Sequence, residues 1–519
     1  MAIRIGGLAS GMDIDTIVSD LMKAERMPLD KLTQRKQILE WQRDDYRDMN
    51  KLLKELDDML FINQNSVGRE ATFLKKSVTS SDESKVTAKA VNAQTNVSAT
   101  IDVLSLASSS TWKTSGDINY TAQDIELKFK VKDPGANEYR YTSVKLSATD
   151  TLDNVINKIN ASGLGVTAMK ENIKVPNTDP AVYQDTIVFT NNKTGAGVEI
   201  AVDERDAAFA TATKDFMSSL GFSWGGTSGN LLITDQNGQD ATIKVNGYEM
   251  QKSLNTFTIN GIEYTAKGVT TQTVDGVTTS SPVSVSSSTD VDSIFDSIVQ
   301  FVNKYNEVIE KINNELSEER YRDYHPLTDE QREAMDEKTI ELWEEKAKSG
   351  LLKNDSILSS GLNQMRMDFY TPVTNSTNIE GFTQLAEIGI STSSNYLEKG
   401  KLIIDEAKLR EKIQENPSAI YQLFNAAGGT EETTGIAKRL RETIDGTIKN
   451  IEEKAGNSLK VNNQFTIGRT LNSIEDQIDR FEDRLIQIED RYWRQFTAME
   501  KAIQQSNSQM SYLMQQFSM

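Results

Sequence analysis

Apolar residues recur every three or four positions at both ends of the chain, and this spacing predicts long amphipathic helices. In the N-terminal part the heptad positions are Leu32, Leu39, Tyr46 and Leu53. In the C-terminal part the corresponding positions are Leu471, Ile474, Ile478, Phe481, Leu485, Ile488, Tyr492 and Phe496. A stripe at this period cannot be buried by one helix alone. We therefore predict a coiled-coil seam at these positions, in which the terminal helices pack on each other or on a neighbouring subunit.

The N-terminal helical region is predicted to contain two helices. Ser10 and Asp13 resemble a capping box ahead of an apolar-periodic run, so a short helix should begin near residue 11. Pro28 is expected to end that helix and to occupy the first turn of the next one. The heptads carry the second helix to about Leu60.

Between about residues 78 and 285 the apolar period drops to two, which is typical of β-strands. Asn260-Gly261 separates two alternating runs and predicts a hairpin with a type I′ turn. We interpret residues 231–247 as a second hairpin, with its turn at Asn237-Gly238. A single helix is expected within this region, over residues 151–161.

Helical spacing returns after residues 283–289, which we interpret as a Ser-rich linker. Thr289 is predicted to cap the long amphipathic helix that follows. Thr328 indicates a capping box at the start of an acidic helix that runs to Ser349. Asn416, which precedes a proline, should cap a further helix.

This order of elements predicts an α+β multidomain fold, with terminal coiled-coil helices packed together, a helical stalk domain and β-rich inserted domains in the middle. The predicted domains are 1–45 with 455–519 (terminal coiled coil), 46–77 with 286–454 (helical stalk), 78–115 with 230–285 (β-rich), and 116–229 (a second β-rich domain inserted in the first).

Composition excludes several classes of protein. The 519 residues include 57 Lys and Arg against 76 Asp and Glu, a net charge of -19, which repels nucleic acid and anionic membranes. There is no cysteine, so disulfides and thiolate sites are excluded. Residues 1–12 lack the apolar core of a Sec signal, and no apolar run is long enough to span a membrane.

Candidate chemistry is sparse. His325 is the only histidine, and we interpret it as a solvated loop residue, so a zinc site is excluded. The calcium-like spacing over 235–240 is better explained by a hairpin turn. The glycine-rich segments 194–197 and 225–229 lack the Lys of a P-loop, and acidic pairs lie on predicted polar helix faces. The sequence therefore predicts no catalytic, cofactor or metal site.

An aromatic cluster lies near the C-terminus at Tyr492, Trp493 and Phe496, with Tyr512 and Phe517 further on. Its helical spacing favours packing over a ligand-stacking or membrane-facing surface. Because two helices cannot cover so many large groups, we expect part of the cluster to lie in a subunit interface.

Four segments resemble one known family. GGLASGMDIDTIVSDLMKAERMPLDKL (6–32) is similar to the N-terminal signature of the flagellar hook-associated protein 2 family, the filament cap proteins. TLDNVINKINASGLGVTA (151–168) resembles a repeat motif of flagellar axial proteins. Residues 388–424 and 492–517 resemble the C-terminal half of the family.

The resemblance implies an extracellular, non-enzymatic scaffold at the tip of the bacterial flagellar filament. It implies a homo-oligomeric ring of about five copies that retains exported flagellin and promotes its polymerisation. It also implies export through the flagellar type III pathway and a cytoplasmic chaperone that recognises the C-terminal segment. Two alternatives are an adhesin that binds glycans through the β-rich insert and a hydrolase that uses acidic residues there.

Overall fold

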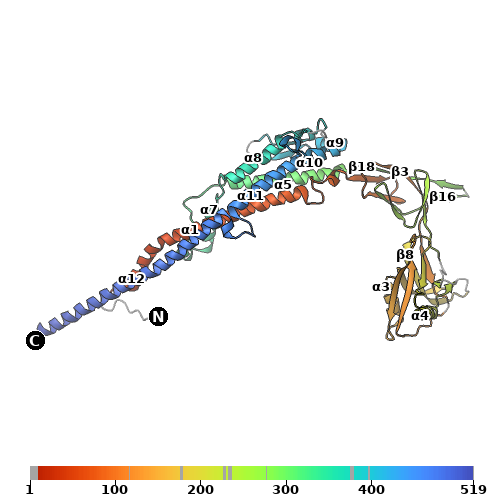
Figure 1. Cartoon of the computed structure of the whole chain (residues 1–519), viewed down its shortest axis with the longest axis horizontal. Coiled ribbons are helices and arrows are strands. Elements are labelled where there is room, and N and C mark those ends of the chain that lie inside the picture. The colour runs from red at the N-terminus through yellow and green to blue at the C-terminus, as the bar shows by residue number, and fades with distance from the viewer. Residues whose placement is uncertain are drawn as a thin grey trace. The chain divides into compact units, whose positions relative to one another are not determined.

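The computed structural model describes residues 10–115, 117–175, 179–225, 229–231, 236–275, 277–374, 379–395 and 398–517. The chain forms two compact units (Figure 1). The helical unit contains Met1–Phe73 and Val291–Met519, and the β unit contains Leu74–Asp290. The predictions for residues 1–9, for Asp235 and for most of segment 225–229 lie outside the described residues.

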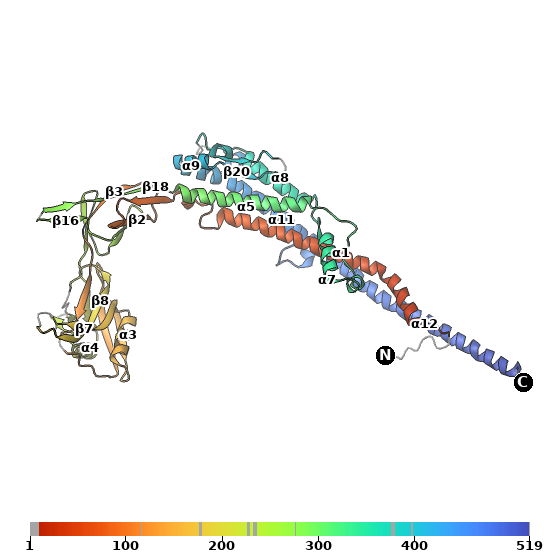
Figure 2. The same ribbon diagram turned by 180° about the vertical axis from the view of Figure 1, so that it is seen from behind.

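The helical unit is built on two long terminal helices and the helices packed beside them. Its helices are α1 (Ile14–Phe61), α2 (Glu70–Phe73), α5 (Val291–Ser317), α6 (Asp329–Glu333), α7 (Glu337–Lys348), α8 (Ser356–Tyr370), α9 (Glu406–Glu415), α10 (Pro417–Asn425), α11 (Ile436–Ala455) and α12 (Thr466–Phe517). A short ribbon joins β19 (Ile390–Thr392) and β20 (Leu402–Ile404). Seen from both sides, α5 and α11 run along α1 (Figures 1 and 2).

One large hydrophobic core holds these helices together. Leu53 of α1 and Phe424 of α10 are fully buried, and the ring of Phe301 on α5 lies 6.0 Å from that of Phe424. Burial of each such side chain contributes about 1.5–3 kcal/mol. The amphipathic periodicity of α5 and α11 is thus explained by a shared core.

The N-terminal region is one helix rather than the two that we predicted. α1 is continuous over 48 residues and contains Pro28. Pro28 costs one hydrogen bond, but Met22 before it and Leu29 after it pack in the same cluster with α12, which offsets that loss. The cap also differs from the prediction, because Asp13 accepts the backbone N–H of Thr16.

The predicted start of α5 was also wrong in part. Residues Val283–Thr289 form strand β18, not a linker, and Thr289 pairs with Lys76 in the sheet. Val283, Val285 and Ser287 of β18 are buried while Ser284, Ser286 and Ser288 are exposed, a period-two pattern that the Ser-rich composition concealed. The helix itself was predicted correctly from residue 291.

The other caps in this unit were mostly as predicted. Thr328 and Gln331 form a capping box, and Asn416 caps α10 by accepting from the backbone of Ala419. The acidic helix, however, stops at Glu333 and begins again as α7, where Asp336 provides a second N-cap. A second cap inside the segment therefore divided what we predicted to be one helix.

The β unit contains two hydrophobic cores with a set of sheets around each. One set orders its strands β1-β18-β3-β12-β13 and β14-β15-β2; the other orders them β10-β11-β9-β5-β6 and β4-β8-β7; β16 and β17 form a separate ribbon. The strands are β1 (Lys76–Ser80), β2 (Val86–Ala90), β3 (Ser98–Ser105), β4 (Ser109–Lys113), β5 (Ile125–Lys132), β6 (Arg140–Leu146), β7 (Val166–Lys174), β8 (Tyr183–Thr194), β9 (Glu199–Val202), β10 (Trp224–Gly225), β11 (Asn230–Leu231), β12 (Ala241–Val245), β13 (Tyr248–Lys252), β14 (Thr256–Ile259), β15 (Ile262–Ala266), β16 (Thr271–Val274), β17 (Val277–Ser280) and β18 (Val283–Thr289).

Only one of the two predicted hairpins was placed correctly. Asn260 and Gly261 have φ of 50° and 76° and join β14 to β15, as a type I′ turn requires. The second hairpin turns at Asn246-Gly247 between β12 and β13, not at Asn237-Gly238. Gly238 instead allows a close backbone approach, because an added Cβ would lie 2.3 Å from the carbonyl oxygen of Gly195.

The β unit contains two helices, α3 (Leu152–Ala161) and α4 (Ala207–Ser219), whereas we predicted one. Thr151 caps α3 as expected for that helix. We missed α4 because its buried positions are partly small or polar, and Ala210 and Thr213 weaken the apolar stripe. Its clearest sequence signal is the N-cap Asp206, which accepts from two backbone N–H groups.

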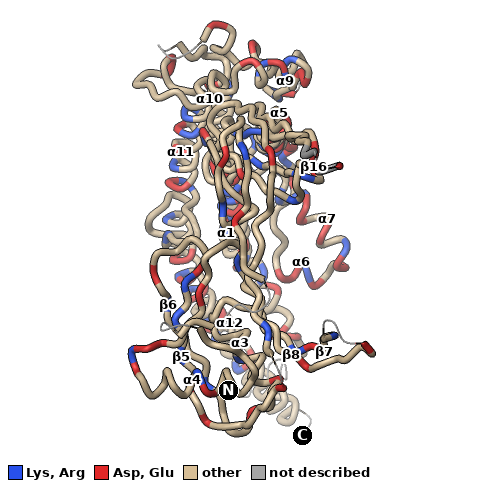
Figure 3. The backbone as a smooth tube through the Cα atoms, turned by 90° about the vertical axis from the view of Figure 1, so that its right-hand side faces the viewer, with Lys and Arg blue, Asp and Glu red and all other residues tan. Residues whose placement is uncertain are grey.

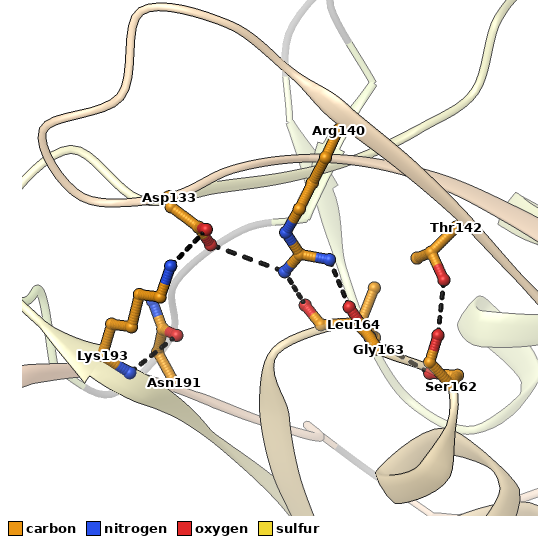
Figure 4. Close-up of polar contacts among 8 residues, drawn as sticks. All are labelled: Asp133, Arg140, Thr142, Ser162, Gly163, Leu164, Asn191 and Lys193. Carbon is orange, nitrogen blue, oxygen red and sulfur yellow. Dashed lines mark hydrogen bonds and ion pairs between the residues drawn. The ribbon is translucent and has the colours of Figure 1, made fainter. Parts of the chain in front are cut away.

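A polar network fixes the end of α3 to the neighbouring strands (Figure 4). Arg140 donates to the carbonyls of Gly163 and Leu164 and pairs with Asp133, which also accepts from Lys193 at 2.6 Å. Burial raises the pKa of Asp133, but hydrogen bonds from Lys193 and Arg140 outweigh it and leave the pKa below its ordinary value. The network therefore holds the turn that follows α3 against strand β6.

Candidate assembly surface of the terminal helices

The four N-terminal seam residues differ in burial along α1. Tyr46 and Leu53 are 1% and 0% exposed and belong to the core of the helical unit. Leu32 and Leu39 are only half-buried. The N-terminal part of α1 is therefore covered less completely by other helices than the part around Tyr46 and Leu53.

The C-terminal seam residues all lie on the covered side of α12. Leu471 belongs to the main core, and Ile474 is 1% exposed. Leu485 and Ile488 are buried in a smaller cluster with Ile14, Val18 and Met22 of α1. The half-buried members are Ile478, Phe481, Tyr492 and Phe496. Much of the seam is thus packed within the chain, and its role as a subunit or filament interface stays a prediction.

The aromatic cluster divides into a packed part and an exposed part. Tyr492 donates to Glu25 at 3.0 Å, and Trp493 and Phe496 pack beside the α1/α12 cluster. This confirms the predicted packing for these residues. Tyr512 and Phe517 are 62% and 88% exposed, so no other described segment covers the end of α12.

Sequence reasoning missed how much apolar surface this last segment presents. Met510, Leu513 and Met514 are also exposed, each by more than half. They continue the three- and four-residue spacing of the seam, which is the signal that could have identified them. We call Lys501–Phe517 the bare segment of α12.

A groove with basic walls follows one side of the α1/α12 pair. Its volume is about 620 Å³. It is lined by Pro28, Lys31, Leu32, Arg35, Gln477, Arg480, Phe481 and Arg484, and we call it the basic groove. Leu32 and Phe481 of the seam form the apolar part of the groove. Its lysine and arginine side chains lie at exposed positions beside the seam. No sequence pattern indicates this groove, because its two walls are more than 400 residues apart in the chain.

The single histidine, His325, and the buried carboxylate of Asp368 both make structural contacts. His325 is exposed in the loop between α5 and α6, as predicted, and its carbonyl accepts from Trp343 Nε1 at 2.8 Å. Asp368 is buried, which raises its pKa, and it accepts a hydrogen bond from Thr443 at 2.7 Å. These contacts hold helices together and present no nucleophile with its base.

Acidic residues gather where α1 and α5 meet. Burial raises the pKa of Asp45 to about 7, and repulsion from Glu315 and Asp48 adds to the shift. In the described part of the chain no group of three or more His, Cys, Asp or Glu residues is arranged to hold a metal ion. Nor does any helix among the described residues have the length and apolar character needed to cross a membrane.

Comparison with known proteins identifies the family. Models of the flagellar hook-associated protein 2 N-terminus and C-terminus match residues 10–110 and 238–508, and a flagellin hook IN motif matches 126–178. Flagellar hook-associated protein 2 of Halalkalibacterium halodurans is 34% identical, with 99% of this chain and 100% of the relative covered. The chain belongs to the flagellar hook-associated protein 2 family. The Thermotoga maritima member is 25% identical over 99% of this chain and 95% of its own.

The fold agrees with a solved member of this family. The crystal structure of the flagellar cap protein FliD D1-D2-D3 domains from Escherichia coli matches with a TM-score of 0.52 at 19% identity, covering 83% of this chain and 99% of that one. The predicted α+β class, with helices at both ends and β-sheets in the middle, is confirmed. The four-domain division stays a prediction, and the adhesin alternative finds no support in these comparisons.

Proposed function

We propose that this chain caps the distal end of the bacterial flagellar filament, as a homo-oligomeric ring that retains exported flagellin and promotes its polymerisation. The observation that carries the proposal is the similarity to flagellar hook-associated protein 2 over the whole length of both chains. The solved relative from Escherichia coli is named as a flagellar cap protein, which agrees with this role.

The surface of the helical unit supports an assembling scaffold. The bare segment of α12 exposes Met510, Leu513, Met514 and Phe517 on a helix that no other described segment covers. Exposed apolar groups on one element mark an interaction site. We assign the half-buried seam residues and the bare segment to contacts with neighbouring copies and with the filament end, in a ring of about five copies.

We also propose that the protein acts outside the cell, at the filament tip, after export through the flagellar type III pathway. A chain with no cysteine passes into an oxidising exterior without forming wrong disulfides. The bare segment of α12 is the surface that a cytoplasmic export chaperone would cover before export, since apolar helix faces require a partner in water. We assign the protein no enzymatic role.

The test uses a flagellated strain that lacks its own cap gene and secretes flagellin as monomers. Expression of this chain should restore filaments and retain flagellin on the cell, and negative stain of the purified protein should show closed rings. A chain that is exported but leaves flagellin in the medium and forms no ring would overturn the proposal. The matched control is the same chain truncated before the bare segment, at Glu500.

A further inference from the structure

The basic groove is an exception on a strongly acidic protein. The chain has a net charge of -19, yet Lys31 and Arg35 on α1 and Arg480 and Arg484 on α12 line one groove. All four side chains are exposed, and in the described part of the chain none of them lies within ion-pair distance of a carboxylate. Leu32 and Phe481 supply an apolar floor between these cations. Such a groove fits an acidic helix that also carries an apolar residue.

Helix α7 has the complementary surface. Glu337, Glu341 and Glu345 are spaced by four residues, so they share one face of the helix, and all three are exposed. None of the three forms an ion pair among the described residues. Leu342, beside this face, is 53% exposed. Helices α6 and α7 carry a dense set of charged residues in the view of Figure 3. We call this surface the acidic face of α7.

Both surfaces lie at the same level of α1. The segment that carries α7 is held there by Gln34, which donates to the carbonyl of Pro326 at 2.8 Å, and by Lys348, which lies 5.0 Å from the ring of Trp41. The basic groove is lined by Lys31 and Arg35 from the same turns of α1. Copies placed side by side with α1 parallel would therefore present an acidic and a basic surface to each other without a shift along the axis.

The two surfaces lie on different sides of α1. At about 100° per residue, Gln34 and Trp41 lie about 60–120° around the helix from Lys31 and Arg35, and about 160–180° from Leu32 of the groove. Because Gln34 and Trp41 hold the α7 segment on their own side, α7 does not cover the groove of its own chain. A neighbouring copy can bring its α7 to the groove.

We propose that the basic groove of one copy binds the acidic face of α7 of the next copy. The contact joins two different surfaces, so it is heterologous, and repetition around an axis closes a ring. Leu342 packs on Leu32 and Phe481, and the glutamates face the arginines and fix the register. This inference rests on the proposed ring and names the residues of its contact.

Proximity can be tested by cross-linking the full-length protein, because the chain has no cysteine of its own. A variant with Leu342→Cys and Gln477→Cys is treated with a short bis-maleimide, and the products are separated by denaturing electrophoresis. We expect a ladder of dimers and higher oligomers that neither single variant gives. The matched control replaces Gln477→Cys by Ile486→Cys, which is also exposed on α12 but lies outside the groove. A control ladder as strong as that of the test pair would overturn the proposal.

Charge reversal tests the energetics of the same contact. Arg480→Glu with Arg484→Glu takes the net charge from -19 to -23, since each change subtracts two charges. Lys353→Glu with Lys449→Glu reaches the same net charge at exposed positions outside the groove and is the matched control. We expect the groove variant to weaken self-association in sedimentation velocity at least about tenfold, and the control less than about twofold. Adding Glu341→Arg and Glu345→Arg should restore association to the groove variant.

Equal effects of the groove and control variants, or no rescue by the reversed glutamates, would contradict the proposed contact. Circular dichroism is recorded for each variant, and a spectrum like that of the parent shows that the substitution leaves the fold intact. Rings and capped filaments without the 342–477 cross-link would refute this contact and leave the capping function standing. The cross-linked ladder without flagellin retention would support the contact and refute the capping function.

Discussion

The two ends of the α1/α12 pair have the same apolar spacing and opposite burial. Around Leu53 and Leu471 the helices are surrounded by α5 and α11, and these side chains are at most 2% exposed. At the other end, Met514 and Phe517 are 66% and 88% exposed on the same helix α12. The apolar period therefore shows that a helix needs a partner. Where the chain's own helices leave the apolar face exposed, we expect another molecule to supply that partner.

The largest expected effect is at the covered end. Leu53→Ala should lower the free energy of unfolding of the helical unit by about 3 kcal/mol, because it leaves a cavity in a closed core. Urea unfolding followed by circular dichroism at 222 nm measures this. Leu342→Ala, at an exposed position, should change the same free energy by less than about 0.5 kcal/mol.

Phe481→Asp tests the middle of the seam, where the side chain is half-buried. We expect it to lower the stability of the α1/α12 pair by about 1–2 kcal/mol, since a charge replaces apolar contact with α1. Ring formation and retention on filament ends should be lost, while the melting transition of the β unit stays unchanged. Asp483→Ala, on the outward face, is the control. Normal capping by Phe481→Asp would remove this residue from the assembly surface.

The acidic cluster between α1 and α5 gives the covered end a pH dependence. Burial, followed by repulsion from Glu315, raises the pKa of Asp45 from 3.8 to about 7. Between these values the folded chain binds more protons than the unfolded chain, so the free energy of unfolding falls as pH rises. Solvent screening limits the change to about 1 kcal/mol.

Asp45→Asn should flatten this profile and stabilise the protein at pH 8. Thermal melting at pH 5, 6, 7 and 8 measures the effect in parent and variant. Asp483→Ala serves as the control, because it lies away from the cluster and should keep the parent's slope. A parent profile that rises with pH over this range would show that the pKa of the half-buried Asp45 is not raised.

The smallest effect on stability is expected at the bare end. Met514→Ser should change the free energy of unfolding by less than about 0.5 kcal/mol, because the residue is 66% exposed and buries little apolar surface. It should nevertheless reduce ring formation, since it removes apolar surface that we assign to the neighbouring copy. Calorimetry and electron micrographs of the same sample separate the two effects. A large loss of stability would mean that the chain itself covers this segment.

Local sequence signals predicted much of the fold and failed where the outcome depended on distant partners. The cap at Thr151 and the turn at Asn260-Gly261 involve neighbours in sequence, and both were placed correctly. Asn237-Gly238 has the same turn chemistry, but the flanking Gln236 and Gln239 form bridges with the distant segment 108–111, so the hairpin forms elsewhere. Pro28 likewise should break a helix, yet packing against α12 keeps α1 continuous.

For the assembly surface, the apolar seam could be predicted from the sequence, but the charged and exposed residues beside it could not. The heptads identified Phe481 and Leu485 as facing a partner, which agrees with their packing on α1. The basic groove requires that Arg35 and Arg480 lie side by side, and no spacing along the chain encodes that distance. The exposure of the bare segment could not be predicted either. It depends on where α1, the helix that packs on α12, begins.

Hydrogen exchange along α12 tests the central claim most directly. In the free monomer, amides around Leu471–Leu485 should exchange slowly, and amides of the bare segment should exchange within seconds. In rings or on filament ends, the bare segment should become protected by at least about tenfold while Leu471–Leu485 stays unchanged. Protection of the bare segment already in the monomer, or no gain on assembly, would contradict the assignment of this end of α12 to a partner.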